Sequence, residues 1–534
     1  MTANVLRRLI VFALLFALVT IAAIGLSGLI ERALGFGTVL VADTAGLARA
    51  LAFVLIAAPL AGMLWWWERR RLADSAERAS LVWALYLAAM SLTSLVVAVS
   101  SAATAAASGI DGEWRPGAVA SAIVWAGVWG WHQRMLRSPA TAPTRLPALG
   151  AELSAPYGLA VAAFGAATVI AVLVSEAATT VTPQLFDSRP WHLAVLQALV
   201  WGIAGALVWW WHWGRAGART APGAFAEVLL VIVVALSAAA ALFGLGTVLH
   251  IVLRLLFDDD PVAQLIAPLG TATGAALVGA IVCVAHTRLL PGRGARAQGA
   301  ARLAVSGVAL IGAASGFGVI VNALLASLDT ALVGGDPRTL LLAGISALII
   351  GAPAWWLIWR SARPATAEEP GDIARRVYLV VVFGASAVVA LVTLLLIGYR
   401  VFEVILGARG DAGTPGGLIE RIRAPFGLLS ATVLVFAYHF TVWRRDRAAA
   451  PPTAKPNRVE RVVLVAGADS ELLAARIRAE TGARVTVWHT AEDGAVGEET
   501  DAAAVITRLG EVTAQRALVV AEPGRATRVV PLSG

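Results

Sequence analysis

Four histidines occupy corresponding positions near the ends of four long apolar segments: His132, His212, His286 and His439. Each is followed within five residues by arginine, and most lie beside tryptophan or tyrosine, as in the stretch VWWWHWGR at 208–215. Neutral imidazoles on facing helices could ligate haem, and a cluster of histidines could sense pH. An aromatic belt is the alternative, in which the rings lie at the level of the lipid headgroups and arginine reaches water.

We favour the belt, because Trp67 and Trp356 take similar positions in two other segments. A belt tolerates tryptophan in place of histidine, whereas a ligand site does not. We therefore assign no cofactor to the histidines and keep haem ligation as a hypothesis.

Six polar residues near the opposite ends of the apolar segments could line a polar vestibule: Glu176, His250, Arg254, Asn322, Arg400 and Glu403. Ionisable groups inside a membrane are costly and often mark a transport pathway. All six stand late in their segments, however, so helices that extend beyond the bilayer are the favoured alternative. Arg400 and Glu403 are three residues apart and are predicted to pair on one helical face.

Other candidates for chemistry are weak. Asp258, Asp259 and Asp260 are adjacent and lack the alternating spacing of a calcium loop, which favours a solvated helix cap. The single cysteine, Cys283, lies in an apolar run and is predicted to pack rather than react. We find no catalytic Ser/His/Asp set and no metal-ligand spacing, so we predict no metal site, no catalytic residue and no enzymatic activity.

The composition places these residues in a membrane. The chain has 534 residues, of which 59% are hydrophobic and 14% are charged, whereas soluble domains carry about 25% charged residues. Twelve segments reach the roughly 20 apolar residues that a spanning helix needs. Their approximate bounds are 9–30, 47–67, 81–108, 118–135, 155–178, 193–213, 225–256, 265–290, 303–328, 340–359, 377–406 and 426–443.

Arginine placement predicts the orientation. Most of the 42 Lys and Arg residues lie at the N-terminus, in every second loop and after the last segment. Basic residues in short loops stay cytoplasmic, so both termini are expected in the cytoplasm, with the chain in a bacterial inner membrane. This placement also explains the pI of about 10.5 without a nucleic-acid partner, and leaves the lipid bilayer as the expected partner.

The segments pair into six tandem units that begin about 70 to 77 residues apart. A typical unit starts with a basic pair and an apolar helix, as in RRVYLVVVFGASAVVALV at 375–392, and returns through a helix that ends in aromatic residues, histidine and arginine. This pattern resembles the bacterial membrane family known as domain of unknown function 5671. The resemblance covers about 6–447 and implies tandem helical copies, but it implies no chemistry. The first and fifth units depart from the pattern at Trp67 and Trp356.

The character of the chain changes after residue 447. We expect three four-helix repeat pairs at 1–150, 151–298 and 299–447, a Pro/Ala linker at 448–460 and a domain at 461–534. This last part is predicted to be a small cytoplasmic α/β domain, with a strand, a helix and a strand at 461–490, a helix at 501–513 and two strands at 516–532. Asp469 or Ser470 is the expected cap of its first helix.

The predicted fold is thus an all-α polytopic membrane protein of about twelve helices in six hairpins, followed by an α/β tail. A non-enzymatic scaffold or sensor, whose tail binds an unknown protein partner, is the leading hypothesis. A transporter or channel for a small solute is the second hypothesis, and a haem or quinone redox protein is the third.

Overall fold

A computed structural model describes residues 3–35, 43–179, 190–328, 337–361, 373–406, 417–449, 459–467, 470–489, 502–512, 514–521 and 527–532. The chain divides into two compact units, a helical unit that extends to Trp443 and a C-terminal unit beyond it. The predicted linker lies mostly outside the described residues, as do Asp469 and the turn before the last strand.

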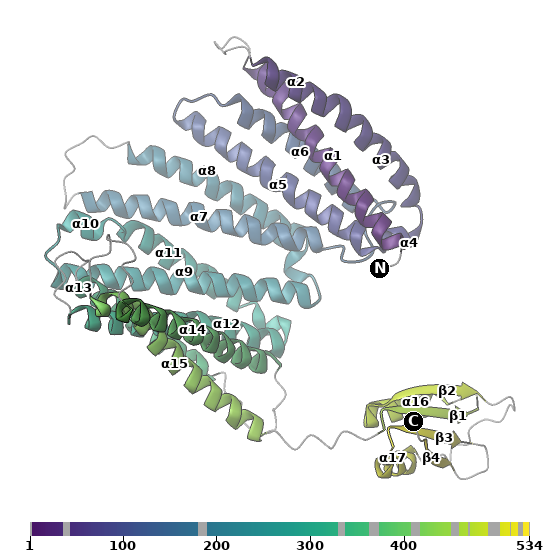
Figure 1. Ribbon diagram of the computed structural model, residues 1–534. Helices are drawn as coiled ribbons and strands as arrows, with labels where there is room; N and C mark the ends of the chain where they lie inside the picture. The colour runs from purple at the N-terminus through teal and green to yellow at the C-terminus, as the bar shows by residue number, and fades with distance from the viewer. Residues whose placement is uncertain are drawn as a thin grey trace. The chain divides into compact units, whose positions relative to one another are not determined.

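The long helices of the described residues form six consecutive antiparallel pairs (Figure 1). α1 (Ala3–Leu34) pairs with the continuous run of α2 (Thr44–Ala52), η1 (Phe53–Ala57) and α3 (Ala58–Arg71). The other pairs are α5 (Leu81–Ile110) with α6 (Pro116–Arg137), α7 (Leu149–Thr179) with α8 (Trp191–Trp210), α9 (Ala224–Phe257) with α11 (Leu269–Thr287), α12 (Ala295–Ala326) with α13 (Pro337–Ser361), and α14 (Ile373–Ile405) with α15 (Leu418–Ala449). The last two helices are not closely packed along their length and meet through aromatic side chains such as Phe383 and Trp443. Short helices connect or extend the pairs: α4 (Ser75–Arg78), η2 (Trp211–Arg215), η3 (Ala218–Thr220), α10 (Val262–Ile266) and η4 (Leu290–Arg293).

Eleven of these helical runs, within the described residues, are long and apolar enough to cross a membrane. The exception among the twelve predicted segments is α6, where tryptophan, glycine and polar residues such as Gln133 dilute the apolar composition. Several helices are longer than the sequence predicts, and α9 has 34 residues. At 1.5 Å per residue, α9 measures about 51 Å, so it is longer than the roughly 30 Å of bilayer hydrocarbon.

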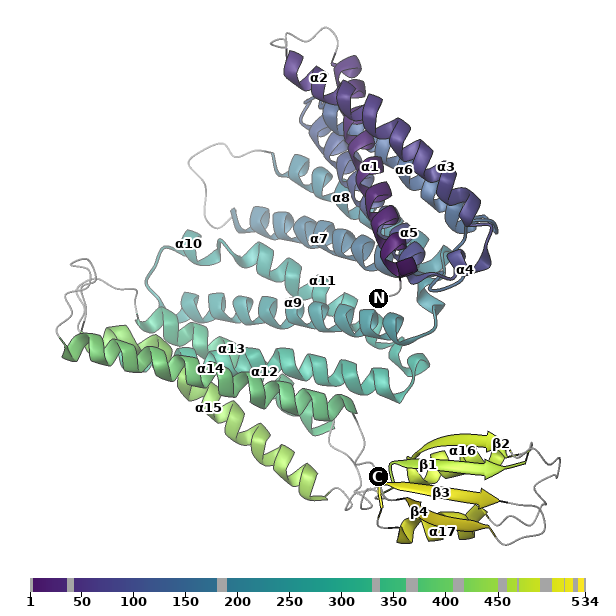
Figure 2. The same ribbon diagram turned by 45° about the vertical axis from the view of Figure 1, so that its right-hand side comes forward.

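The pairs lie side by side in chain order, as the two ribbon views agree (Figure 2). In the described part of the chain, closely packed helices belong to the same pair or to consecutive pairs: α5 contacts α7, α7 contacts α11, α9 contacts α12 and α13, and α12 contacts α14. The helical unit is therefore an open row, in which each pair buries its surface against its neighbours.

Glycine allows the closest approaches within this row. A Cβ atom added at Gly165 of α7 would lie 2.4 Å from the backbone nitrogen of Gly202 in α8. Gly270 and Gly274 of α11 also face a neighbour, since added Cβ atoms would lie 2.3 Å from carbonyl oxygens of α7. Small residues at helix interfaces let backbones approach in lipid, where dispersion replaces the hydrophobic effect.

Two helices end or bend through wide π-helical turns. The turn η1 ends two residues before Pro59, and its wider hydrogen bonds accommodate a proline within this continuous helical run. The turn η2 continues α8 through the WHWGR residues, where the amide of Ala216 donates to the carbonyl of Trp211 at 2.8 Å.

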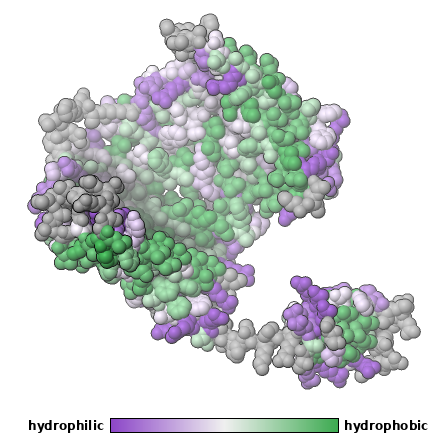
Figure 3. Space-filling view, viewed as in Figure 1, coloured by the Kyte–Doolittle hydropathy of each residue, from purple (hydrophilic) through white to green (hydrophobic). Residues whose placement is uncertain are grey.

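The surface of the helical unit suits lipid. Figure 3 shows broad apolar areas along the helices and hydrophilic residues gathered toward helix ends. Large apolar side chains such as Phe164 and Leu395 are exposed, at 70% and 65%. The interior is built from residues that lie between helices, among them Leu15, Trp83 and Leu87, which have no exposure.

The C-terminal unit has the predicted α/β character. β1 (Arg461–Ala466), β2 (Arg484–His489), β3 (Arg516–Ala521) and β4 (Arg528–Leu532) form a sheet with the order β2-β1-β3-β4. β1 runs parallel to β2 and β3, and β4 is antiparallel to β3. The helices α16 (Glu471–Thr481) and α17 (Ala502–Glu511) contribute Ile477 and Leu509 to its core. Ser470 precedes α16 as predicted, but its hydroxyl makes no capping bond.

Candidate functional site

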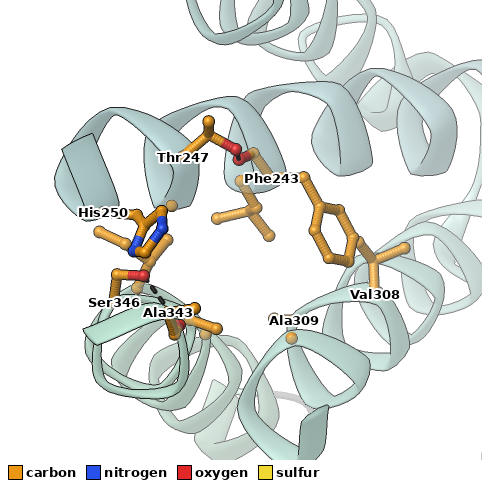
Figure 4. Close-up of a pocket in the computed structure, with 13 residues that line it drawn as sticks. Phe243, Thr247, His250, Val308, Ala309, Ala343 and Ser346 are labelled. Carbon is orange, nitrogen blue, oxygen red and sulfur yellow. Dashed lines mark hydrogen bonds between the residues drawn. The ribbon is translucent and has the colours of Figure 1, made fainter. Parts of the chain in front are cut away.

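A cavity of about 180 Å³ lies between α9, α12 and α13 and contains the predicted vestibule residue His250 (Figure 4). In this view the imidazole of His250 stands at one end of the cavity, and Phe243 and Val308 stand at the other. Apolar and small side chains form most of the wall, as is usual for small-molecule sites. The cavity is lined by Leu242, Phe243, Gly246, Thr247, His250, Val308, Ala309, Gly312, Ala343, Ser346, Ala347, Ile350 and Gly351.

Two hydroxyl groups in this cavity have hydrogen-bond partners within the described part of the chain, and one imidazole nitrogen does not. The hydroxyl of Thr247 donates to the carbonyl of Phe243 at 2.9 Å, and that of Ser346 donates to the carbonyl of Ala343 at 2.8 Å. The Nδ1 atom of His250, in contrast, is buried without a hydrogen-bond partner among the described residues. Since an unpartnered buried polar atom costs about 1–3 kcal/mol, a ligand that bonds to Nδ1 would recover part of this energy.

Glycines on three helices create the space. α12 and α13 meet closely, because a Cβ at Gly351 would lie 2.5 Å from the backbone nitrogen of Ala313. Opposite this contact, a Cβ at Gly246 of α9 would meet no atom within 4 Å, and one at Gly312 would approach only Gly351, at 3.8 Å. The cavity therefore lies between α9 and the tightly packed pair of α12 and α13, where glycines have no side chains to fill the space.

Ion pairs join α9 to α13 beyond the His250 end of the cavity. Arg254, one turn after His250, donates to Asp258 at 2.8 Å and to Asp260 at 2.5 Å. From α13, Arg338 donates to the carbonyl of Phe257 at 2.9 Å and Thr339 to Asp258 at 3.3 Å. The predicted cap is thus also a link between helices, in which Asp258 is buried against Arg254 while Asp259 and Asp260 remain exposed.

This link determines the titration of Asp258. The hydrogen bond from Arg254 lowers the pKa of the Asp258 carboxyl, and the positive charge of Arg254 and the hydrogen bond from Thr339 act in the same direction. The carboxylate is therefore ionised at neutral pH and holds the connection between α9 and α13 under ordinary conditions.

The other predicted vestibule residues lie in separate contacts. Arg400 donates to Glu403 at 3.0 Å, which confirms the predicted pair, and Arg421 of α15 lies 3.6 Å from the same carboxylate. Asn322 of α12 accepts a hydrogen bond from Arg423 at 3.2 Å. Glu176 is half-buried near the end of α7.

The four repeated histidines share one local geometry. In each, Nδ1 lies 2.8 or 2.9 Å from the carbonyl oxygen of a valine four residues earlier, at positions 128, 208, 282 and 435. All four side chains are buried, with at most 4% exposure. The prediction that these histidines face the lipid headgroups is wrong, because each imidazole is enclosed by neighbouring helices.

Aromatic residues enclose these imidazoles. The hydroxyl of Tyr86 in α5 lies 3.2 Å from Nε2 of His132, which accepts if Nδ1 carries the hydrogen. His439 lies among Trp355, Trp359, Tyr378 and Tyr438, and the ring centroids of Trp213 and His286 are 5.6 Å apart. These contacts explain the histidines as parts of packed aromatic clusters. Within the described residues, no hydrogen bond joins two of the four imidazoles.

Other aromatic residues do face outward, as a belt requires. Trp66, Trp210 and Trp356 are at least half exposed, at 55%, 50% and 51%. Arginine guanidinium groups lie over all three rings, at 3.7 Å for Arg70 on Trp66 and at 5.4 Å for Arg215 on Trp210. Within the stretch that contains His212, the tryptophans therefore divide between an outward belt and inward packing.

The described residues contain no group of three or more His, Cys, Asp or Glu side chains that could hold a metal ion. The arrangement instead offers a small, mainly apolar cavity with one available imidazole nitrogen. Such a site can bind a ligand. The hydroxyls of Thr247 and Ser346, which also line it, both donate to backbone carbonyls, and none of the described Asp or Glu residues belongs to its wall.

Comparison with known families identifies the helical repeats. Residues 8–131 and 300–431 both match the family model of a domain of unknown function, DUF5671. The chain contains two DUF5671 domains. No curated protein and no solved structure matches the chain.

Each DUF5671 match covers two hairpins. The first extends from α1 into α6, and the second extends from α12 into α15. His132 directly follows the first match and His439 stands shortly after the second, each on the last helix of its domain. Tyr86 on α5 and Tyr378 on α14, the third long helices of the two domains, contact these histidines. The buried aromatic cluster thus occurs in both four-helix repeats that contain a DUF5671 match, and its histidine lies just beyond each match.

The cavity lies at the edge of the second DUF5671 domain, between its helices α12 and α13 and the preceding α9. Among its lining residues, sequence reasoning found His250 and missed Gly246, Ala309 and Gly312. The local sequence does not indicate that these small residues line a cavity, because Gly and Ala are frequent throughout the apolar segments.

Proposed function

We propose that this protein is a non-enzymatic membrane sensor that binds one small, mainly apolar molecule in the cavity of α9, α12 and α13. The single observation that supports the proposal is the unpartnered Nδ1 of His250 in an otherwise apolar cavity. The C-terminal unit would bind a protein partner in the cytoplasm.

Size and hydrogen bonding define the ligand class. An engineered apolar cavity of about 150 Å³ is known to hold benzene, so a cavity of about 180 Å³ suits one ring. A hydroxyl group can donate to Nδ1 of His250 or accept from it, so it suits this unpartnered atom in either tautomer of the imidazole. The preferred ligand is therefore a small ring with a hydroxyl group, such as a phenol.

The proposed setting is a bacterial inner membrane with twelve spanning helices and both termini in the cytoplasm. Residues 151–298 would form a third four-helix repeat between the two DUF5671 domains. This interpretation is supported by His286, which repeats the bond to valine found at His132 and His439.

Binding can be tested with the full-length protein in nanodiscs and two fluorine probes, 4-fluorophenol and fluorobenzene, followed by ¹⁹F NMR against empty nanodiscs. We expect saturable binding that favours 4-fluorophenol. His250→Phe should remove this preference, Gly312→Leu should block both probes by filling the cavity, and His192→Phe at the exposed start of α8 should change neither. Unchanged binding in Gly312→Leu would contradict the proposed site.

The open row of hairpins favours sensing over transport, the second candidate, because many transporters place their site between two inverted halves. Proteoliposomes that accumulate 4-fluorophenol at a saturable rate would overturn the sensor assignment. For the redox candidate, a Soret band in the purified protein would be the contrary result.

A further inference from the structure

A second, basic cavity opens where the first DUF5671 domain meets the helices that follow it. Its volume is about 420 Å³, and it lies between the end of α6, the start of α7 and the π-helical turn η2. We call it the basic pocket; it is lined by Gln133, Leu136, Arg137, Pro147, Ala148, Ala151, Trp211, His212, Arg215 and Ala216. The cavity around His250 is a different one, since none of these residues lines it.

Positive charge in the basic pocket is uncompensated. Arg137 and Arg215 both line it, and no Asp or Glu does. Within the described residues, no carboxylate pairs with either arginine, whereas Arg7 and Arg8 at the same end of the helices pair with Glu77 at 2.8 Å. Two guanidinium groups that converge on one cavity provide the donors that phosphate oxygens prefer.

Aromatic rings hold these guanidinium groups in place. Arg137 of α6 lies 5.7 Å from the ring centre of Trp211, which belongs to η2, and Arg215 lies 5.4 Å from that of Trp210. These cation–π contacts limit the conformations of both side chains without neutralising their charge. The arginines are therefore positioned for a ligand before it binds.

The N-terminus of α7 adds to the positive electrostatic potential of the basic pocket. α7 begins at Leu149, so the positive end of its dipole lies beside Ala148 and Ala151 of the pocket. Glu152, the acidic residue of that turn, lines a different cavity together with Arg293. The charge of Glu152 is thus opposed by an arginine outside the basic pocket.

The turn η2 brings His212 into the wall of the pocket. Its Nδ1 bonds to the carbonyl of Val208 at 2.9 Å, and its buried Nε2 has no partner among the described residues. Single π-helical turns occur often at functional sites, because the extra residue redirects the side chains that follow. Here the turn contributes Trp211, His212 and Arg215 to one cavity.

We propose that the basic pocket binds the phosphate of an anionic phospholipid headgroup. The exposed tryptophans Trp66, Trp210 and Trp356 with their stacked arginines mark the level of the headgroups at this end of the helices. Basic pockets between membrane helices are suited to such headgroups, and the volume accommodates one. The lipid would bridge the first DUF5671 domain and α7 by bonding to Arg137 on one side and to Arg215 on the other.

The test uses the full-length protein in detergent, titrated with phosphatidylglycerol, phosphatidylcholine or inorganic phosphate, with thermal stability and native mass spectrometry as readouts. We expect phosphatidylglycerol to raise the Tm and to remain bound as one tightly held lipid, with phosphatidylcholine having little effect. The double variant Arg137→Gln/Arg215→Gln should bind phosphatidylglycerol about ten-fold more weakly, whereas Arg137→Lys/Arg215→Lys should retain most of the binding.

The matched control is Arg70→Gln/Arg360→Gln, which removes two arginines that also stack on exposed tryptophans but lie outside the pocket. This control should bind phosphatidylglycerol like the unaltered protein. An equal loss in the control would overturn the site, because general surface charge would then explain the binding. Full stabilisation by inorganic phosphate alone would overturn the assignment to a lipid, and an unaltered affinity in Arg137→Gln/Arg215→Gln would overturn both.

Discussion

Tyr86 connects the buried His132 to a neighbouring helix through a single hydrogen bond of 3.2 Å. Tyr86→Phe removes the hydroxyl and leaves Nε2 of a fully buried imidazole without its partner. We expect a loss of about 1 kcal/mol in the free energy of unfolding, in the range measured for hydrogen bonds between membrane helices. Chemical unfolding in detergent measures this loss, and Tyr399→Phe, at a 61% exposed ring, should have no effect.

Asp258 should give stability a pH dependence with a defined sign. The bond from Arg254 lowers its folded-state pKa, so Asp258 stabilises the protein above the ordinary aspartate pKa of about 3.9 and loses this effect as the pH falls through the lower folded value. The Tm difference between the unaltered protein and Asp258→Asn should therefore stay constant from pH 7 to about pH 5 and shrink at lower pH. A difference that grows on acidification would show that the sign is wrong.

Single residues were predictable where their partners are local in sequence. The Arg400–Glu403 pair follows from a spacing of three residues on one helix, and it forms as expected. The burial of His132 and His439 was not predictable, because Tyr86 and Trp359, which contact them, lie 46 and 80 residues away. The local sequence predicts that an aromatic or histidine side chain lies near the end of a helix. Whether that side chain faces lipid or protein depends on how the helices pack.

At the scale of helices, the α11–α7 contact depends on the absence of a side chain at Gly274. A Cβ there would lie 2.3 Å from the carbonyl oxygen of Ala167, which requires the two helices to separate. Gly274→Ala should lower the Tm by several degrees, since lost dispersion contacts weaken an interface in lipid. Gly384→Ala on α14, where an added Cβ meets no atom within 4 Å, is the matched control and should leave the Tm unchanged or raise it.

The helices themselves were largely predictable, because long apolar runs have few alternatives in a membrane. The ends of the helices were harder to predict. α12 begins at Ala295, eight residues before the predicted segment, because the residues that extend it are too polar to be recognised as part of an apolar run. The cavity of His250 depends on the relative position of α9, α12 and α13. Gly246, Gly312 and Gly351 give no signal of that position within their own helices.

At the scale of the whole molecule, the open row of hairpins explains why the family comparison identifies two separate DUF5671 domains. Each four-helix domain buries surface against adjacent hairpins, so sequence constraints act locally and distant copies can diverge independently. The stretch between the domains contains α7 to α11 and supplies walls of both cavities. Ligands at these cavities would therefore act at the boundaries between repeats, by contacting helices of neighbouring pairs.

Membrane topology tests this arrangement most directly, because the twelve-span prediction depends on α6. We expect single cysteines, introduced in a Cys283→Ala background in place of Asp111, Ala140 and Asp259, to be labelled by an impermeant maleimide in a defined pattern. Asp111→Cys and Asp259→Cys should react from outside intact cells, and Ala140→Cys should react only after permeabilisation. Arginine at the ends near Ala140 predicts this orientation.

If α6 does not span, the pattern changes at two of the three positions. Position 140 would then lie outside with position 111, and position 259, after one crossing fewer, would lie inside. Its tryptophans and Gln133 make α6 less apolar than the eleven other helices, and in that case they would hold it at the membrane surface. Against this, α6 packs along α1 and α5. We expect α6 to span, because its contacts with two spanning helices extend along the bundle and compensate for its lower hydrophobicity.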